Sequence, residues 1–160
     1  MGVSGSGKST IGKMLADKLK WEFEDADDFH SQDSIKKMKR GIPLTEEDRN
    51  PWLQTIQDAI NQWLEEGKNV VLACSALKED YREKFCYGQD QVTLVYLQGS
   101  YEVIKQRLGN RKDHFMDENL LESQFETLEE PTEGIHVKIT NSPETVVNEI
   151  IEQFKEERKY

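Results

Sequence analysis

The sequence predicts an α/β fold in which a parallel sheet is covered by helices on both faces. Two continuous apolar runs of strand length, NVVLAC at 69–74 and VTLVYL at 92–97, have the composition of buried parallel strands. A segment with helical spacing follows each of them after a short connection. Strands and helices that alternate in this way form parallel sheets with helices on both faces. The 160 residues have the length of one domain, and we expect a single domain over 1–160.

A helix, a strand and a second helix are expected before residue 42. The first helix follows a glycine-rich opening loop, and its apolar residues recur at helical spacing: Ile11, Met14, Leu15 and Leu19. WEFED at 21–25 is a short strand that ends in acidic residues. The second helix begins with Ser31 as its N-cap and ends just before Gly41.

A longer helix is expected over 50–67. Asn50 caps it, Pro51 takes its first position and Gly67 ends it. Its inward stripe consists of Trp52, Ile56, Ile60 and Trp63.

The remaining elements also follow recognisable start signals. After the strand at 69–74, Ser75 is expected to cap a helix that runs to about Phe85, and Ser100 caps the helix at 101–108. HVKIT at 136–140 is the last strand, and Ser142-Pro143 starts the last helix. The segment at 109–133 is polar and mixed in character, and it is the best candidate for a mobile flap.

The composition excludes several classes of partner. The net charge is −10, from 31 acidic against 21 basic residues, whereas nucleic acids and anionic membranes attract basic surfaces. No apolar run approaches 18 residues, so we expect no membrane span. Cys74 and Cys86 are the only cysteines, and two free thiols in a reducing compartment indicate a cytoplasmic protein.

The opening loop carries the strongest motif. Residues 2–9, GVSGSGKS, fit G-x-x-x-x-G-K-[ST], in which backbone N–H groups surround phosphate oxygens and the following helix points its positive end at the same anion. Lys8 would neutralise the β- and γ-phosphates, and Ser9 would supply a hydroxyl to Mg²⁺. The plain alternative is a glycine- and serine-rich turn at a tail. The ATP-binding residues predicted here are Gly2, Val3, Ser4, Gly5, Ser6, Gly7, Lys8, Ser9 and Thr10.

A phosphate loop predicts a nucleotide but leaves the reaction open. The N-K-x-D guanine motif of GTPases is absent from the sequence, and 160 residues are too few for the partner domains of ATP motors. A compact phosphotransferase that acts on a small acceptor remains.

Acidic residues follow the second predicted strand, where ligands bind in open α/β sheets. A carboxylate at Asp25 would hold a Mg²⁺-bound water, and Asp27, two residues on, would accept a proton from the attacking hydroxyl. A solvated acidic turn is the alternative, and it is favoured for Asp28. Two roles are open for His30, contact with a ligand or packing at the start of a helix.

Four cations are candidates for binding an acidic acceptor or the transferred phosphoryl group. Arg49 lies near the start of a helix, Lys78 and Arg82 lie one turn apart after the third strand, and Arg111 lies in the flap. For each of these four side chains, a role as an ordinary surface charge is an equally good interpretation. Arginine suits a carboxylate because its planar fork binds both oxygens.

Together these residues resemble the small P-loop gluconokinases, relatives of shikimate kinase and the nucleoside-monophosphate kinases. The similarity runs from residue 2 to about 131, and CSALK and SQFETLE are specific to this family. The matching stretches are GVSGSGKST, DADDFH, KMKRGIPLTEEDRNPWL, VVLACSALKEDYRE, VYLQGSYEVIKQRL, HFM and SQFETLEEP.

The resemblance implies a three-layer P-loop fold and ATP-dependent phosphorylation of D-gluconate at O6, with Mg²⁺. It matches Asp25 and Asp27 to a D-x-D pair that serves Mg²⁺ and the acceptor hydroxyl, and Arg49 to an arginine that grips the acceptor carboxylate. The family also suggests a homodimer.

The remaining site residues come from the same resemblance. It implies a lid at about 107–130 with Arg107 and Arg111, the latter catalytic, and an adenine site at Asn141 and Pro143. The acceptor-binding residues expected are Asp27, His30, Arg49, Lys78, Arg82, His114 and Gln124, and the metal-binding residues are Ser9 and Asp25.

One departure from the pattern concerns the start of the chain. Family members carry an apolar strand before the phosphate loop, and here Met1 alone precedes it. We therefore expect the fold to lack a central strand between 70–73 and 93–97, and the natural protein to begin several residues earlier. The rival hypotheses are a kinase for another small polar acid and a non-catalytic isoform.

Overall fold

Strands and helices alternate along the chain as predicted. The computed structural model describes residues 1–110 and 118–158. Its elements are α1 (Lys8–Leu19), β1 (Glu22–Asp25), the 3₁₀ turn η1 (Ala26–Phe29), α2 (Gln32–Lys39), α3 (Glu46–Glu65), β2 (Val70–Ala73), α4 (Glu79–Phe85), β3 (Val95–Gln98), α5 (Tyr101–Gly109), α6 (Glu118–Thr127), β4 (Ile135–Lys138) and α7 (Pro143–Glu157). The α/β class is confirmed. Within the described residues, no helix is both long and apolar enough to cross a membrane.

The strands in the described part of the chain form two parallel pairs, and these pairs are not joined into one continuous sheet. β1 pairs with β2 in the register Glu22↔Val70, and β3 pairs with β4 in the register Val95↔Ile135. Met1 lies beside β3: its α-amino nitrogen donates to the Val95 carbonyl at 2.5 Å, and its own carbonyl accepts from the Leu97 N–H at 3.0 Å. One residue of ladder does not join β2 to β3, which are the two strands expected to flank a central strand.

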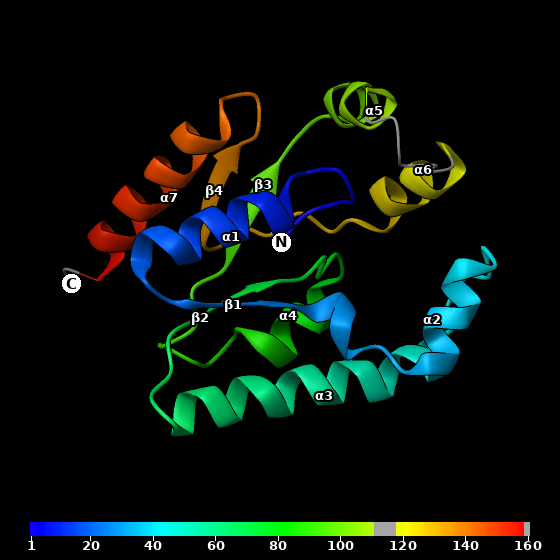
Figure 1. Cartoon of the computed structure of the whole chain (residues 1–160), viewed down its shortest axis with the longest axis horizontal. Coiled ribbons are helices and arrows are strands. Elements are labelled where there is room, and N and C mark those ends of the chain that lie inside the picture. The colour runs from blue at the N-terminus through cyan, green and yellow to red at the C-terminus, as the bar shows by residue number, and fades with distance from the viewer. Residues whose placement is uncertain (111–117, 159–160) are drawn as a thin grey trace.

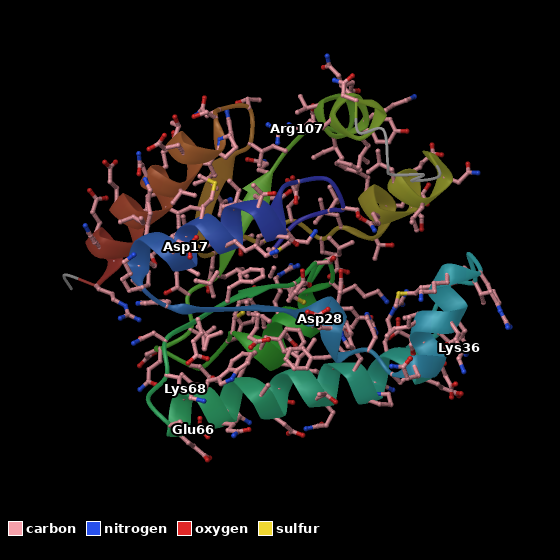
Figure 2. All side chains as sticks on the ribbon, viewed as in Figure 1. Asp17, Asp28, Lys36, Glu66, Lys68 and Arg107 are labelled. Carbon is pink, nitrogen blue, oxygen red and sulfur yellow. The ribbon has the colours of Figure 1, made fainter. Side chains whose placement is uncertain are left out.

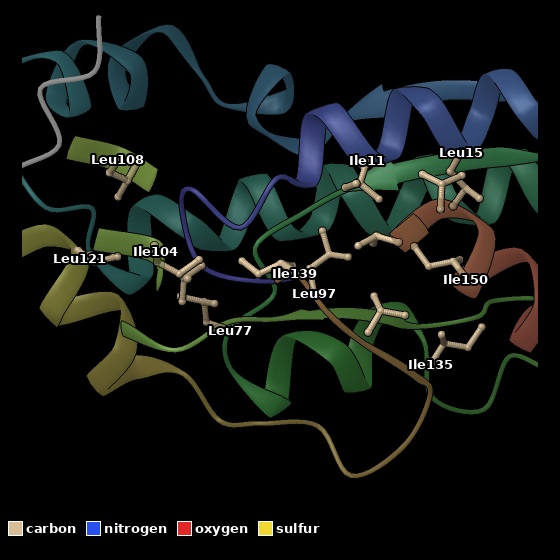
Figure 3. Packing of buried hydrophobic residues seen from close by; sticks show 14 residues of the cluster. Ile11, Leu15, Leu77, Leu97, Ile104, Leu108, Leu121, Ile135, Ile139 and Ile150 are labelled. Carbon is tan, nitrogen blue, oxygen red and sulfur yellow. The ribbon is translucent and has the colours of Figure 1, made fainter. Parts of the chain in front are cut away.

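Helices cover both faces of these strands (Figure 1). On one face α1 packs against β1, β2 and α7, and α7 packs on β4. The apolar cluster on this side includes Ile11, Leu15, Leu97 and Ile150 (Figure 3). It extends under α5 and α6 through Ile104, Leu108 and Leu121.

A second apolar cluster lies under α3 and α4 on the other face. Ile56 is fully buried there with Trp52, Leu53 and Phe85. Trp52 also donates its indole N–H to the Ala26 carbonyl at 2.7 Å, which ties α3 to the turn after β1. This bond fixes the acidic turn relative to the long helix.

The long helix begins earlier than predicted, and Asn50 is not its cap. Thr45 and Asp48 form a capping box in which the Thr45 side chain accepts from the Asp48 N–H and the Asp48 carboxylate accepts from the Thr45 N–H. Two satisfied N–H groups start α3 at Glu46. Pro51 therefore lies inside the helix, which forgoes one backbone hydrogen bond at that position.

The predicted cap at Ser75 is also wrong. α4 begins at Glu79 with Lys78 as its N-cap, and Ala76 before it has a positive φ of 44°. The Arg82 guanidinium donates to the carbonyls of Ala76 and Leu77 at 2.9 and 3.1 Å. These bonds hold the segment before α4 in an irregular conformation. The caps predicted at Ser31, Ser100 and Ser142 are confirmed.

The polar segment at 109–133 contains a helix, α6, that the sequence analysis did not anticipate. α6 packs against α5, with Tyr101 and Phe125 in an edge-to-face contact at 5.5 Å between ring centroids. Leu121 is buried in the main cluster. Residues 111–117 of the predicted flap lie outside the described residues.

Candidate active site

The phosphate loop joins Met1 to the first turn of α1. Gly2, Gly5 and Gly7 all have positive φ, at 151°, 82° and 96°. A Cβ on Gly5 would lie 2.9 Å from the Leu108 side chain, and one on Gly2 would lie 2.7 Å from Ser6 Oγ. Side chains at these two positions would collide, so glycine lets the backbone curl tightly around the site.

Polar groups of this loop have the arrangement that an anion would satisfy. Ser6 Oγ is buried without a hydrogen-bond partner among the described residues. α1 begins at Lys8 without a side-chain cap, which leaves its first N–H groups available. Both observations fit a phosphate group at a helix N-terminus.

Lys8 folds back over the loop. Its Nζ donates to the Val3 carbonyl at 3.0 Å. Burial lowers the pKa of Lys8, while the nearby charges of Asp27 and Asp25 act in the opposite direction. An arriving phosphate would stabilise the charged ammonium, because it adds negative charge where water is scarce.

Ser9 and Asp25, the two residues predicted to bind a metal ion, are in contact. The Ser9 hydroxyl donates to Asp25 Oδ2 at 2.9 Å, and Asp25 Oδ1 accepts from the Asp27 N–H at 3.0 Å. Within the described part of the chain, no three His, Cys, Asp or Glu side chains are grouped to hold a metal ion. A hydroxyl and one carboxylate nevertheless suit Mg²⁺, which keeps several waters and takes oxygen ligands from phosphates.

Asp27 follows in the turn η1 on the edge of this site. Partial desolvation and then the charge of Asp25 raise its pKa, while Lys8 lowers it, although the side chain is exposed by area. Such a shift is typical of a carboxylate in a functional site. Asp28 lies exposed in the same turn (Figure 2).

His30 packs at the end of the turn. Its ring stacks on Trp52 at 4.4 Å between centroids and an interplanar angle of 9°. Its Nδ1 is buried without a partner among the described residues, and burial lowers the pKa of the imidazole. His30 therefore has the packing role in the structure. Contact of its Nδ1 with a ligand stays a prediction.

Two of the four predicted cations are brought together by a residue that the sequence analysis missed. Glu46 accepts from Arg49 at 3.1 Å and from Lys78 at 2.8 Å. The Tyr81 hydroxyl also lies 3.3 Å from the Glu46 carboxylate. The i, i+3 spacing of Glu46 and Arg49 on one helix is a signal that could have indicated this pair.

Arg82 does not join these cations at the surface. Only 1% of its side chain is exposed, and its NH1 bonds the two carbonyls before α4. Its Nε has no partner among the described residues. This placement gives Arg82 a structural role in the loop that carries Lys78, and direct acceptor binding by Arg82 stays a prediction.

The predicted adenine side is assembled from α5 and the loop before α7. The Arg107 guanidinium donates to the Ile139 carbonyl, so α5 reaches this loop (Figure 2). Asn141 lies exposed beyond it, bonded to Glu149 at 3.1 Å, and Pro143 is the first residue of α7. Thr10, also predicted to bind ATP, is exposed in the first turn of α1.

Gln124 lies against the phosphate loop. Its Oε1 accepts from the Ser4 N–H at 2.7 Å, which links α6 to the loop across 120 residues of sequence. The sequence predicts that Gln124 binds the acceptor. Its contact with Ser4 also connects it to the phosphate loop. Arg111 and His114 lie outside the described residues.

Comparison with known proteins decides the family. The sequence model for shikimate kinase matches residues 4–156. A gluconokinase from Arabidopsis thaliana is 46% identical over 95% of this chain and 88% of its own length. The thermoresistant gluconokinase of Escherichia coli is 42% identical over 97% of this chain and 91% of its own length. The chain belongs to the gluconokinase family.

A solved structure from this family has the same fold. The crystal structure of a gluconokinase from Sinorhizobium meliloti superimposes with a TM-score of 0.85 at 37% identity, over 98% of this chain and 89% of that one. As a member of the gluconokinase family, the chain is a phosphotransferase of the P-loop type, which uses a nucleotide.

Proposed function

We propose that this chain transfers the γ-phosphoryl group of ATP to O6 of D-gluconate and forms 6-phospho-D-gluconate, with Mg²⁺. The observation that carries the proposal is the contact of Ser9 with Asp25, which places the end of β1 beside the phosphate loop. This contact supports a shared site for the nucleotide and for the acidic turn after β1. The substrate follows from the names of the relatives that the chain matches at 42–46% identity.

The nucleotide would be held by the phosphate loop. Its backbone N–H groups surround the phosphates, and Lys8 leaves the Val3 carbonyl for the β- and γ-oxygens. Ser9 and Asp25 would hold Mg²⁺ directly or through water, and the ion would supply charge neutralisation at the phosphates. Most of the acceleration would come from positioning and electrostatic stabilisation.

Asp27 would accept the proton of the attacking hydroxyl. Desolvation and Asp25 raise the pKa of Asp27 while Lys8 lowers it, and a higher pKa strengthens a carboxylate as a proton acceptor. The O6 oxygen forms a bond to phosphorus as the bond to the β-phosphate oxygen breaks. The proton moves from O6 to Asp27.

The acceptor carboxylate would bind Arg49 and Lys78. Both cations are paired with Glu46, whose carboxylate has the shape and charge of the group they would meet on gluconate. Arg107 and Arg111 would screen the transferred group, and His30, His114 and Gln124 would complete the acceptor and lid contacts.

A coupled assay with ATP and a panel of sugar acids tests the proposal. We expect turnover with D-gluconate and at least tenfold lower kcat/KM with shikimate or with glucose, which lacks the carboxylate. Asp28→Asn, next to the proposed base, is the matched control and should leave turnover unchanged. A higher kcat/KM for another acid would assign the rival acceptor, and absence of transfer in folded protein would favour a non-catalytic isoform.

A further inference from the structure

The segment that carries Lys78, residues 74–78 between β2 and α4, has an irregular backbone. We call it the Lys78 loop. Ala76 has a positive φ of 44°, a conformation that is costly for a residue with a Cβ. The buried Arg82 binds the carbonyls of Ala76 and Leu77 from within α4. These bonds fix the loop on one side of Lys78 and leave the other side to a different partner.

Lys78 cannot cap the helix that it precedes. It is the N-cap residue of α4, and among the residues that the structure describes its side chain makes no capping hydrogen bond. A lysine ammonium is only a donor, whereas the first N–H groups of a helix need an acceptor. The acceptor for the Glu79 N–H, the first of α4, therefore has to come from another part of the chain or from water.

Glu129 supplies this acceptor from the segment that follows α6 (Figure 1). Its Oε2 accepts from the Glu79 N–H at 2.5 Å, across 50 residues of sequence. Its own N–H donates to the Leu77 carbonyl at 2.9 Å. One residue thus binds the backbone on both sides of Lys78.

The neighbours of Glu129 are fastened to other parts of the molecule. Gln124 Oε1 accepts from the Ser4 N–H of the phosphate loop at 2.7 Å. The Tyr96 hydroxyl donates to Glu130 Oε1 at 3.0 Å, which ties the same segment to β3. The end of α6 and the residues after it therefore connect the phosphate loop, β3 and the Lys78 loop.

A fixed backbone decides where the Lys78 ammonium lies. Its Nζ donates to Glu46 at 2.8 Å and lies 5.7 Å from the centre of the Tyr81 ring. A long side chain on a loose backbone would occupy many positions, and holding it in one place lowers the entropic cost of binding a ligand. The bonds of Glu129 provide this order without any contact between Glu129 and the ligand.

We propose that Glu129 is a positioning residue for the acceptor: its two hydrogen bonds to the backbone beside Lys78 hold the ammonium where it meets the substrate carboxylate. This inference rests on the proposed function, in which Lys78 binds the carboxylate of gluconate. The acceptor oxygen of Glu129 carries the effect. Its negative charge alone would repel an anionic substrate, so the two roles predict changes of opposite sign.

The first test is a series of three substitutions. Glu129→Gln keeps the length and an acceptor oxygen, Glu129→Asp keeps the charge but is one methylene shorter, and Glu129→Ala removes both. We expect the KM for gluconate to rise about three- to tenfold with Asp and Ala, the effect of one hydrogen bond, and to stay within about twofold with Gln. The KM for ATP and kcat should stay within about twofold in all three. A parental KM with Asp, or a lower KM with Gln and Ala, contradicts the inference.

Tyr96→Phe is the matched structural control. It removes the bond to Glu130 from the same segment and leaves the backbone beside Lys78 untouched. Its melting temperature should fall by about 2–4 °C, with an unchanged KM for gluconate. A rise in KM as large as that of Glu129→Ala would show that any loosening of the segment has this effect, and would overturn the specific role of Glu129.

A double-mutant cycle tests whether Glu129 acts through Lys78. It uses Glu129→Asp, the milder change, so it does not depend on whether Glu129→Ala folds. In a Lys78→Met background, Glu129→Asp should raise the KM for gluconate by less than about twofold, because the group that it positions is gone. Additive effects would mean that Glu129 acts by another route, and the inference would be wrong.

Amide hydrogen exchange separates this inference from the proposed function, because it needs no substrate. The Glu79 amide should exchange at least about tenfold faster in the Asp and Ala variants than in the parent and the Gln variant. If the parent phosphorylates no gluconate, the proposed function fails whatever the exchange shows. If the parent is active and the Asp and Ala variants keep its KM for gluconate, the positioning role of Glu129 fails alone.

Discussion

Lys78 and Glu46 form an ion pair of 2.8 Å across 32 residues of sequence, at the point where the loop after β2 meets the start of α3. Arg49 shares the same carboxylate oxygen at 3.1 Å. Two cations from separate elements thus converge on one anion. A carboxylate substrate that binds these cations must compete with Glu46 or share them with it.

Glu46→Gln should therefore tighten the binding of an acidic acceptor. The amide keeps a hydrogen-bond acceptor but removes the competing charge, and exposed ion pairs are worth about 0.2–1 kcal/mol. We expect the KM for gluconate to fall up to about fivefold while the KM for ATP stays constant. Glu47→Gln, exposed beside it, is the control. A rise in the gluconate KM would show that Glu46 positions the cations more than it competes for them.

Arg49→Lys should have the opposite effect on the same ligand. A point charge replaces a planar fork that can bind both carboxylate oxygens. The KM for gluconate should rise about tenfold, with little change for ATP. Steady-state kinetics with each substrate varied in turn measures both constants, and equal effects on the two ligands would remove Arg49 from the carboxylate site.

Lys8→Ala should abolish most transfer and leave the fold intact. Loss of one electrostatic donor to a developing charge costs on the order of 10²–10³ in kcat. Among the residues that the structure describes, the ammonium donates to the Val3 carbonyl alone, so its removal should change the melting temperature by no more than a few degrees. Lys13→Ala, on the exposed side of the same helix, should retain normal kcat. Normal turnover by the Lys8 variant would contradict the role of the phosphate loop.

Elements whose signals lie within a few neighbouring residues were predicted correctly. The apolar runs of β2 and β3 and the serine caps of α2, α5 and α7 are short-range patterns, and they were read correctly. Asn50 failed as a cap because the reciprocal bonds of Thr45 and Asp48 start the helix earlier. Ser75 does not cap α4, because the buried Arg82 binds the carbonyls of Ala76 and Leu77 and keeps this segment out of the helix. No cap pattern in the sequence reveals such a contact.

The sequence could indicate the arrangement around the phosphate loop better than the arrangement of the predicted acceptor cations. The spacing of the phosphate loop and the pair of carboxylates after β1 are encoded within a few residues, and the structure brings Ser9 from one into contact with Asp25 from the other. The convergence of Arg49 and Lys78 on Glu46 depends on how α3 approaches the loop after β2. Such an arrangement is set by tertiary packing, which sequence spacing alone does not define.

Asp27→Asn should separate binding from chemistry. The amide cannot accept the proton of the acceptor hydroxyl, and loss of a general base typically costs about 10²–10⁴ in rate. ATP binding, measured by calorimetry, should persist because Ser9, Asp25 and the phosphate loop are untouched. If Asp25→Asn showed this signature and Asp27→Asn did not, the two carboxylates would exchange roles.

Asp27→Asn should also change the thermal stability of the protein, and the direction of this change follows from the pKa of Asp27. Desolvation and Asp25 raise the folded-state pKa of Asp27 above its usual value of 3.8, so the folded state binds more protons than the unfolded state between those two pKa values. Stability then falls as pH rises through that window, and the ionised Asp27 is destabilising at neutral pH. Asp27→Asn should accordingly melt at the same or a higher temperature than the parent at pH 7, and this difference should shrink as the pH falls toward 4. Thermal melting at pH 7 and pH 4 measures the change, with Asp28→Asn in the exposed neighbouring position as the control. A lower melting temperature for Asp27→Asn at pH 7 would mean that the carboxylate supports the fold, and its loss of activity would then say little about proton transfer.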